Sequence, residues 1–145
     1  MKRLILYILA VFAITIVVVG CGSSNTSSSG NTELEGTWTE TVPGTDIMPA
    51  MTLTFTFSGN NWASIETTTS ATVYQMSGTF TLDSTANPKT LDLYITTATL
   101  WSNMVGTTLH GIYQLSGTNL AIANGQGGTR PTSFTTDNTA NLVKQ

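Results

Sequence analysis

The sequence predicts an all-β domain, and three observations point to it. Threonine supplies 29 of the 145 residues, and the strand-favouring residues Val, Phe, Tyr and Trp are spread along the chain. The helix-favouring residues Glu, Lys and Arg are scarce after the first 20 residues. Apolar and hydroxyl side chains alternate repeatedly, as in half-buried strands. We therefore expect a small antiparallel up-and-down β-barrel of about eight strands at residues 33–145, with a two-sheet sandwich as the alternative.

Alternation and turn residues define the expected strands in order. The first strand begins at Gly36, and polar turns are expected at 58–61 and 116–119. Because short turns join antiparallel neighbours, consecutive strands should lie side by side. The further strands are expected at 51–58, 62–67, 74–82, 91–95, 109–115, 120–123, 132–136 and 139–143.

The first 32 residues have the features of an export signal followed by a tether. Lys2 and Arg3 precede 17 uncharged residues that end at Gly20. The sequence Val18-Val19-Gly20-Cys21 resembles the lipobox of bacterial lipoproteins. That resemblance implies a helical signal peptide at 1–20, cleavage between Gly20 and Cys21, and a diacylglyceryl thioether on Cys21. Because 17 residues also reach the lower limit for a spanning helix, of about 17, an uncleaved anchor is the alternative.

The lone cysteine and the residues after it fit a lipid-anchored exported domain. Cys21 has no partner for an internal disulfide, and lipidation would convert its thiol into a thioether. Residues 22–32 are Ser, Asn, Thr and Gly only, so 21–32 is expected to be a lipidated cysteine and a flexible tether. The positive residues precede the apolar run, which predicts export of the rest. In a bacterium with two membranes, Asp at the position of Gly22 commonly retains a lipoprotein in the inner membrane, so the resemblance favours the outer membrane of the cell envelope if the host has one.

The charge balance excludes several partner classes. Without residues 1–20, 3 basic and 8 acidic side chains remain, which gives a net −5. Nucleic acids and anionic lipid surfaces both require clustered cations, so neither is expected as a partner. We expect a monomer whose membrane contact is the acylated Cys21.

A series of motifs resembles a small bacterial lipocalin-like domain family of uncharacterised function. The motifs are Gly36-Thr37-Trp38, the segments 78–83, 87–93, 111–117 and 120–123, and Arg130-Pro131-Thr132-Ser133-Phe134. The resemblance implies a barrel in which Trp38 closes one end and Arg130 packs across it, as a cation–π pair within about 6 Å. It assigns no functional residue.

An apolar pocket is the main candidate for a binding site, because a barrel of this size can hold one small molecule. A core filled by its own side chains is the alternative. Pocket candidates are Phe55, Phe57, Tyr74, Met76, Phe80, Leu93 and Tyr113, with Met48, Met51, Met104, Trp62 and Trp101 as further apolar residues.

Signals for catalysis are weak. His110 is the only histidine, so a metal site lacks ligands, and we expect a surface or half-buried strand residue there. Glu33, Glu35 and Glu40 are expected to be solvated charges, and Gly125–Gly128 is not followed by a phosphate-binding helix. We therefore expect no enzyme, cofactor or metal. The expected function is an envelope lipoprotein that binds a small apolar ligand, and the alternative is a structural or protein-interaction module.

Overall fold

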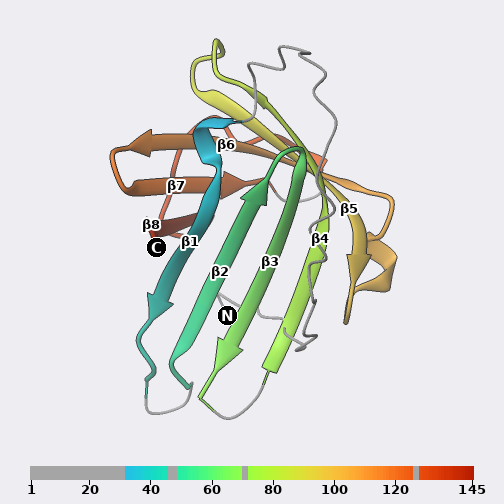
Figure 1. The fold of residues 1–145 in the computed structure, drawn as a ribbon, viewed down its shortest axis with the longest axis vertical. Helices are drawn as coiled ribbons and strands as arrows, with labels where there is room; N and C mark the ends of the chain where they lie inside the picture. Colours follow the sequence, from blue (N-terminus) through green and yellow to red (C-terminus); the bar gives the residue numbers. More distant parts are fainter. Residues whose placement is uncertain (1–31, 46–48, 70–71, 126–127) are drawn as a thin grey trace, which may run out of the picture.

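A computed structural model describes residues 32–45, 49–69, 72–125 and 128–145, which form a closed antiparallel barrel with its strands in sequence order (Figure 1). The predicted up-and-down barrel is thus confirmed over the sandwich. The predicted signal peptide, Gly20, Cys21 and the tether up to residue 31 lie outside the described residues. The strands are β1 Gly36–Val42, β2 Met51–Ser58, β3 Asn61–Thr68, β4 Thr72–Asp83, β5 Lys89–Ala98, β6 Thr108–Ser116, β7 Asn119–Asn124 and β8 Thr139–Lys144. Two 3₁₀ helices are η1 Thr32–Leu34 and η2 Ser102–Met104.

Alternation sets which side chains enter the barrel. In β2, Met51, Leu53, Phe55 and Phe57 are buried, whereas the threonines between them are partly or fully exposed. This is the period of two that a pleated strand imposes. Gly59 in the β2–β3 turn has a φ of +59°, a conformation that glycine adopts without steric cost.

The strand predicted at 132–136 is wrong. Pro131 cannot donate to a strand ladder, and Asn138 closes a turn by accepting the Thr135 N–H on its side chain at 2.9 Å. This part of the β7–β8 connection instead lies on the outer face. Arg130 bonds the Gly111 carbonyl there, beside the outward-facing Ile112, which is 0% exposed.

The two ends of the barrel differ in their connections. Turns 59–60, 84–88 and 117–118 gather at one end, which we call the tight-turn end. The other four connections gather at the opposite end, because successive strands alternate in direction. Three of them are long, at 43–50, 99–107 and 125–138. We call this the loop end; η1 lies at the tight-turn end, where Glu35 accepts the Gly59 N–H.

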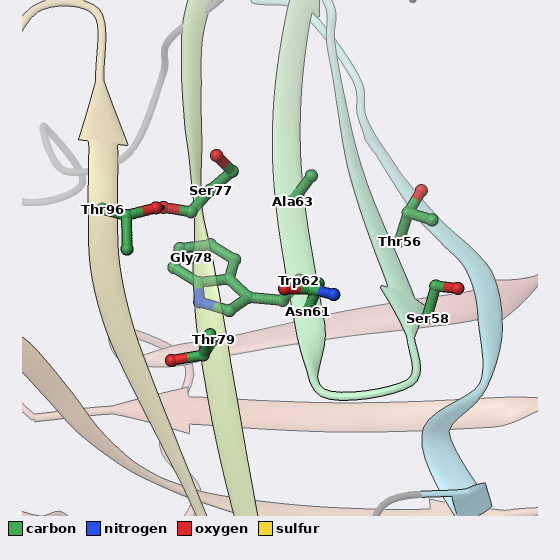
Figure 2. Close-up of a pocket in the computed structure, with 9 residues that line it drawn as sticks. All are labelled: Thr56, Ser58, Asn61, Trp62, Ala63, Ser77, Gly78, Thr79 and Thr96. Carbon is green, nitrogen blue, oxygen red and sulfur yellow. Dashed lines mark hydrogen bonds between the residues drawn. The ribbon is translucent and has the colours of Figure 1, made fainter. Parts of the chain in front are cut away.

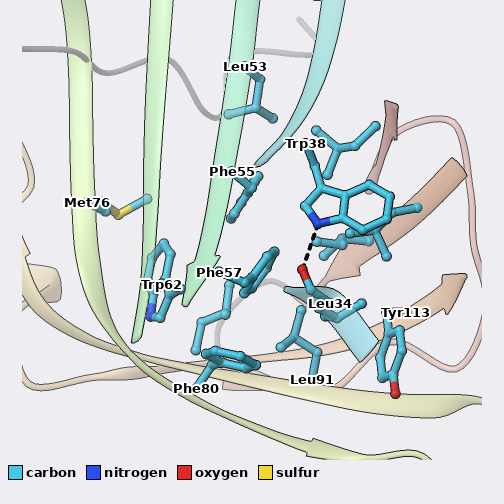
Figure 3. Close-up of a cluster of buried hydrophobic side chains, with 14 of the residues drawn as sticks. Leu34, Trp38, Leu53, Phe55, Phe57, Trp62, Met76, Phe80, Leu91 and Tyr113 are labelled. Atoms are coloured by element: carbon cyan, nitrogen blue, oxygen red, sulfur yellow. Dashed lines mark hydrogen bonds between the residues drawn. The ribbon is translucent and has the colours of Figure 1, made fainter. Parts of the chain in front are cut away.

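Aromatic side chains fill the interior toward the tight-turn end (Figure 3). Phe57 stacks on Phe55 with ring centroids 5.9 Å apart and meets Phe80 edge-on at 5.0 Å. Leu34 of η1 is 0% exposed, and its carbonyl accepts the Trp38 indole N–H at 2.7 Å. This end is therefore closed by packed side chains.

Candidate functional site

A buried carboxyl lies inside the loop end of the barrel. On β3, Trp62, Ser64 and Glu66 alternate inward, and Glu66 is only 2% exposed. The strand register places it directly across from Leu53 of β2 and Tyr74 of β4. Glu66 thus places an acid on the inward face of β3 near the loop end.

The Glu66 carboxyl lacks compensation within the described part of the chain. Its Oε1 is buried and has no hydrogen-bond partner among the described residues. Burial raises the pKa of Glu66 to about 9, so the carboxyl is neutral at pH 7. A buried polar group without a partner is unfavourable, and native proteins contain few of them.

Asn124 provides a second orphaned oxygen at the same end. It is the last residue of β7 and shares the parity of the core residues Leu120 and Ile122, so it occupies an inward position. Its Oδ1 is buried and also has no hydrogen-bond partner among the described residues. It lies over Gly111 of β6, where an added Cβ would approach that oxygen to 2.6 Å.

Glu40 is a further acid at the level of Glu66. The register aligns Glu40 of β1, Leu53 of β2 and Glu66 of β3, so the two acids lie two strands apart, about 10 Å. Glu40 Oε2 accepts the Asn141 backbone N–H at 3.1 Å, on the loop-end side of the two residue pairs that join β1 to β8. Burial raises the pKa of Glu40, and this hydrogen bond opposes the rise.

A polar cluster of Glu33, Lys89 and Tyr113 lies at the tight-turn end. Lys89 Nζ lies 2.9 Å from Glu33 Oε2, and the Tyr113 hydroxyl donates to Glu33 Oε1. Burial would raise the pKa of Glu33, but these hydrogen bonds and the Lys89 charge lower it overall. Burial and the bond to Glu33 raise the pKa of Tyr113. The cluster joins η1 to β5 and β6, which is a structural role.

Arg130, Asp92 and His110 form an outer cluster. Arg130 Nη2 lies 2.7 Å from Asp92 Oδ1, and Nη1 donates to the Gly111 carbonyl at 2.5 Å. His110 Nδ1 is 3.0 Å from the same Asp92 oxygen, and its half-buried side chain faces outward. The cluster fastens the β7–β8 connection to the barrel wall.

The cation above the Trp38 ring is Lys144, with Nζ 5.0 Å from the ring centroid. The resemblance implied Arg130 for this place, but the contacts of Arg130 are those of the outer cluster. Lys144 reaches Trp38 because β8 pairs with β1, which puts these two residues directly opposite each other.

The predicted pocket residues divide between the two parts of the interior. Six of them are buried in the core: Phe55, Phe57, Met76, Phe80, Leu93 and Tyr113. Tyr74 is partly buried and stacks on Trp101 at 5.6 Å. Tyr74 and Met76 lie on the part of β4 that is beside the Glu66 region. Met48 lies outside the described residues. Sequence reasoning missed Glu66, although its even spacing from Trp62 already places both on one face of a strand.

A hollow also lies on the outer face of β2–β5 (Figure 2). Its volume is about 340 Å³, and it is open to solvent. The small Ala63 stands between Thr56 and Ser77 in the strand register, which leaves a depression among longer side chains. The lining residues are Thr56, Ser58, Asn61, Trp62, Ala63, Ser77, Gly78, Thr79 and Thr96.

The residues that the structure describes contain no group of three or more His, Cys, Asp or Glu side chains that could hold a metal ion. None of the helices in the described ranges has the length and apolar character needed to span a membrane.

Comparisons with protein-family models, with curated proteins and with solved structures each found no match to this chain.

Proposed function

We propose that this protein is a non-enzymatic envelope lipoprotein whose lipocalin-like barrel binds a small, largely apolar ligand through its loop end. The observation that carries the binding proposal is the pair of orphaned buried oxygens, on Glu66 and Asn124, at inward positions of this end. A ligand that hydrogen-bonds them would remove an unfavourable feature of the empty barrel. Barrels commonly bind ligands at their mouths.

The anchoring proposal is supported by the lipobox-like sequence ending at Cys21. In the barrel, η1 enters at the tight-turn end, with Leu34 inserted into the core. A tether that precedes η1 therefore joins the barrel at the tight-turn end and not at the loop end.

Metabolic labelling with an alkyne-modified fatty acid tests the anchor. Cells producing the full chain should incorporate the label into the protein, and Cys21→Ser should abolish incorporation. Ser23→Ala is the matched control and should be labelled normally. Equal labelling of the Cys21→Ser protein would refute lipidation at this residue.

Binding of the neutral apolar dye Nile red tests the pocket. The dye should bind the barrel saturably, and Leu53→Trp should weaken binding because it fills the interior beside Glu66. Thr54→Trp is the control, because Thr54 faces outward from the same strand. Circular dichroism checks that both variants keep the fold. A folded barrel that binds no dye would contradict the proposal.

The outer hollow favours a second function, a protein-interaction module with a filled core. Its lining is rich in hydroxyl groups, and Ser77 of this lining shares a 2.6 Å hydrogen bond with Thr97. A photoreactive residue at Ala63 should then cross-link a defined partner in intact cells, whereas the same residue at the exposed Thr118 turn should not. Equal cross-linking from both positions would contradict this function.

A further inference from the structure

The orphaned oxygens at the loop end are both hydrogen-bond acceptors. Asn124 Oδ1 is an amide oxygen, which can only accept, and Glu66 in its ionised form also accepts only. A ligand matched to these atoms therefore brings N–H or O–H donors. An ammonium group supplies three donors and no acceptor.

The described part of the chain places no cation beside Glu66. Its three basic side chains have partners elsewhere: Lys89 with Glu33, Arg130 with Asp92, and Lys144 above the Trp38 ring. The positive charge that would compensate an ionised Glu66 must therefore come with the ligand. Glu40, on the same level, adds a second acid and favours the same sign of ligand charge.

Apolar side chains lie near Glu66 on the two neighbouring strands. Met51 and Leu53 on β2 and Met76 on β4 occupy inward positions and are at least 92% buried. Methionine adapts its shape to irregular apolar groups. The site thus combines an apolar wall with acceptors, which suits a molecule with a cationic head and a hydrocarbon tail.

We infer that the ligand is a lipophilic primary amine, whose ammonium head pairs with Glu66 while its chain lies against Met51, Leu53 and Met76. This inference rests on the proposed function and names the class of its ligand.

Binding of such an amine has a defined proton balance. At pH 7 the empty site holds a protonated Glu66, and the amine arrives as an ammonium ion. When the pair forms, the carboxyl O–H bond breaks and one proton passes to solvent, which leaves a carboxylate–ammonium pair. The other titratable groups that face Glu66 are Tyr74 on β4 and Glu40 on β1, and β2 presents none there.

Calorimetric titration with octylamine and octanol tests the inference. The protein is the chain from residue 21 onward with Cys21→Ser, which contains all eight strands and the whole described core. Octylamine should bind at least tenfold more tightly than octanol at pH 7. Titrations in phosphate and in Tris, which differ in ionisation enthalpy, should report about one proton released per bound amine.

Glu66→Gln should lower the octylamine affinity at least tenfold and remove the proton release. Glu35→Gln is the matched control at the tight-turn end and should bind octylamine normally. Equal affinities for the two probes, or no proton release from the unaltered barrel, would overturn the inference but not the proposed function. Failure of both probes to bind would overturn both. The proton count needs no variant, so it decides the question even if Glu66→Gln does not fold.

Discussion

The buried Glu66 makes the stability of the empty barrel depend on pH, and Glu66→Gln should remove that dependence. The carboxyl keeps its proton in the folded state up to about pH 9, whereas the unfolded chain releases it near pH 4.5. Between these values the folded state binds more protons than the unfolded state. The stability contribution is therefore complete below about pH 4.5 and is lost as pH rises toward 9.

The size of this effect follows from the pKa difference. Each pH unit within the window changes the free energy of unfolding by about 1.4 kcal/mol, so the barrel should lose about 4 kcal/mol between pH 5 and pH 8 through Glu66. The glutamine amide has a similar shape and no proton to lose. Glu66→Gln should therefore match the parent within about 1 kcal/mol at pH 5 and exceed it by about 3–4 kcal/mol at pH 8.

Urea denaturation followed by tryptophan fluorescence measures the difference at several pH values. Other shifted acids contribute to each curve, with Glu40 acting in the same direction as Glu66 and Glu33 in the opposite direction. They remain in both proteins, so the difference between the curves isolates Glu66. Parallel curves for the parent and Glu66→Gln would show that Glu66 titrates alike in the folded and unfolded states, and the reasoning would be refuted.

Four further substitutions test the packing of the barrel by urea denaturation. Gly78→Ala should lower the free energy of unfolding by about 3 kcal/mol, because its Cβ would overlap a carbonyl oxygen of β5. Gly59→Ala has open space around it and should lower the free energy of unfolding by only about 1 kcal/mol, because of its positive φ. Equal losses would contradict the close approach at Gly78. Arg130→Ala should cost about 1–2 kcal/mol and speed proteolysis within 129–138, and an unchanged cleavage rate would argue against its fastening role. Tyr113→Phe should cost about 1 kcal/mol through loss of the bond to Glu33, and an unchanged stability would argue that the bond contributes nothing.

Local pattern was sufficient to predict most of the barrel wall. In β2 the alternation of apolar residues with threonine predicted both the strand and its buried face. The segment 132–136 failed because Pro131 precedes it and Asn138 closes a turn on Thr135, so it belongs to the connection between β7 and β8 and not to the barrel wall. Its place depends on Arg130 reaching Asp92 and Gly111, which are distant in sequence. Alternation carries no information about such a contact.

The polar part of the interior could be identified only from the strand register of the closed barrel. The parity of Glu66 with Trp62 could be read from the sequence, but its lack of a counter-charge could not, because that depends on where Lys89, Arg130 and Lys144 lie. The same limit explains the cation above Trp38. Its identity follows from the pairing of β8 with β1, which closes the barrel and joins residues more than 100 positions apart.

The position of Glu66 links the stability of the barrel to its proposed use. A buried acid without a partner destabilises the empty protein at neutral pH, and an apolar residue of similar size would avoid that loss. A cationic ligand would convert the same acid into half of an ion pair, so occupied barrels should be the more stable ones. Because η1 and the tether join at the opposite end, this exchange can occur at the loop end without disturbing the packed aromatic core. The division of the interior into a filled end and an acidic end therefore separates the residues that hold the barrel together from those that we propose bind its ligand.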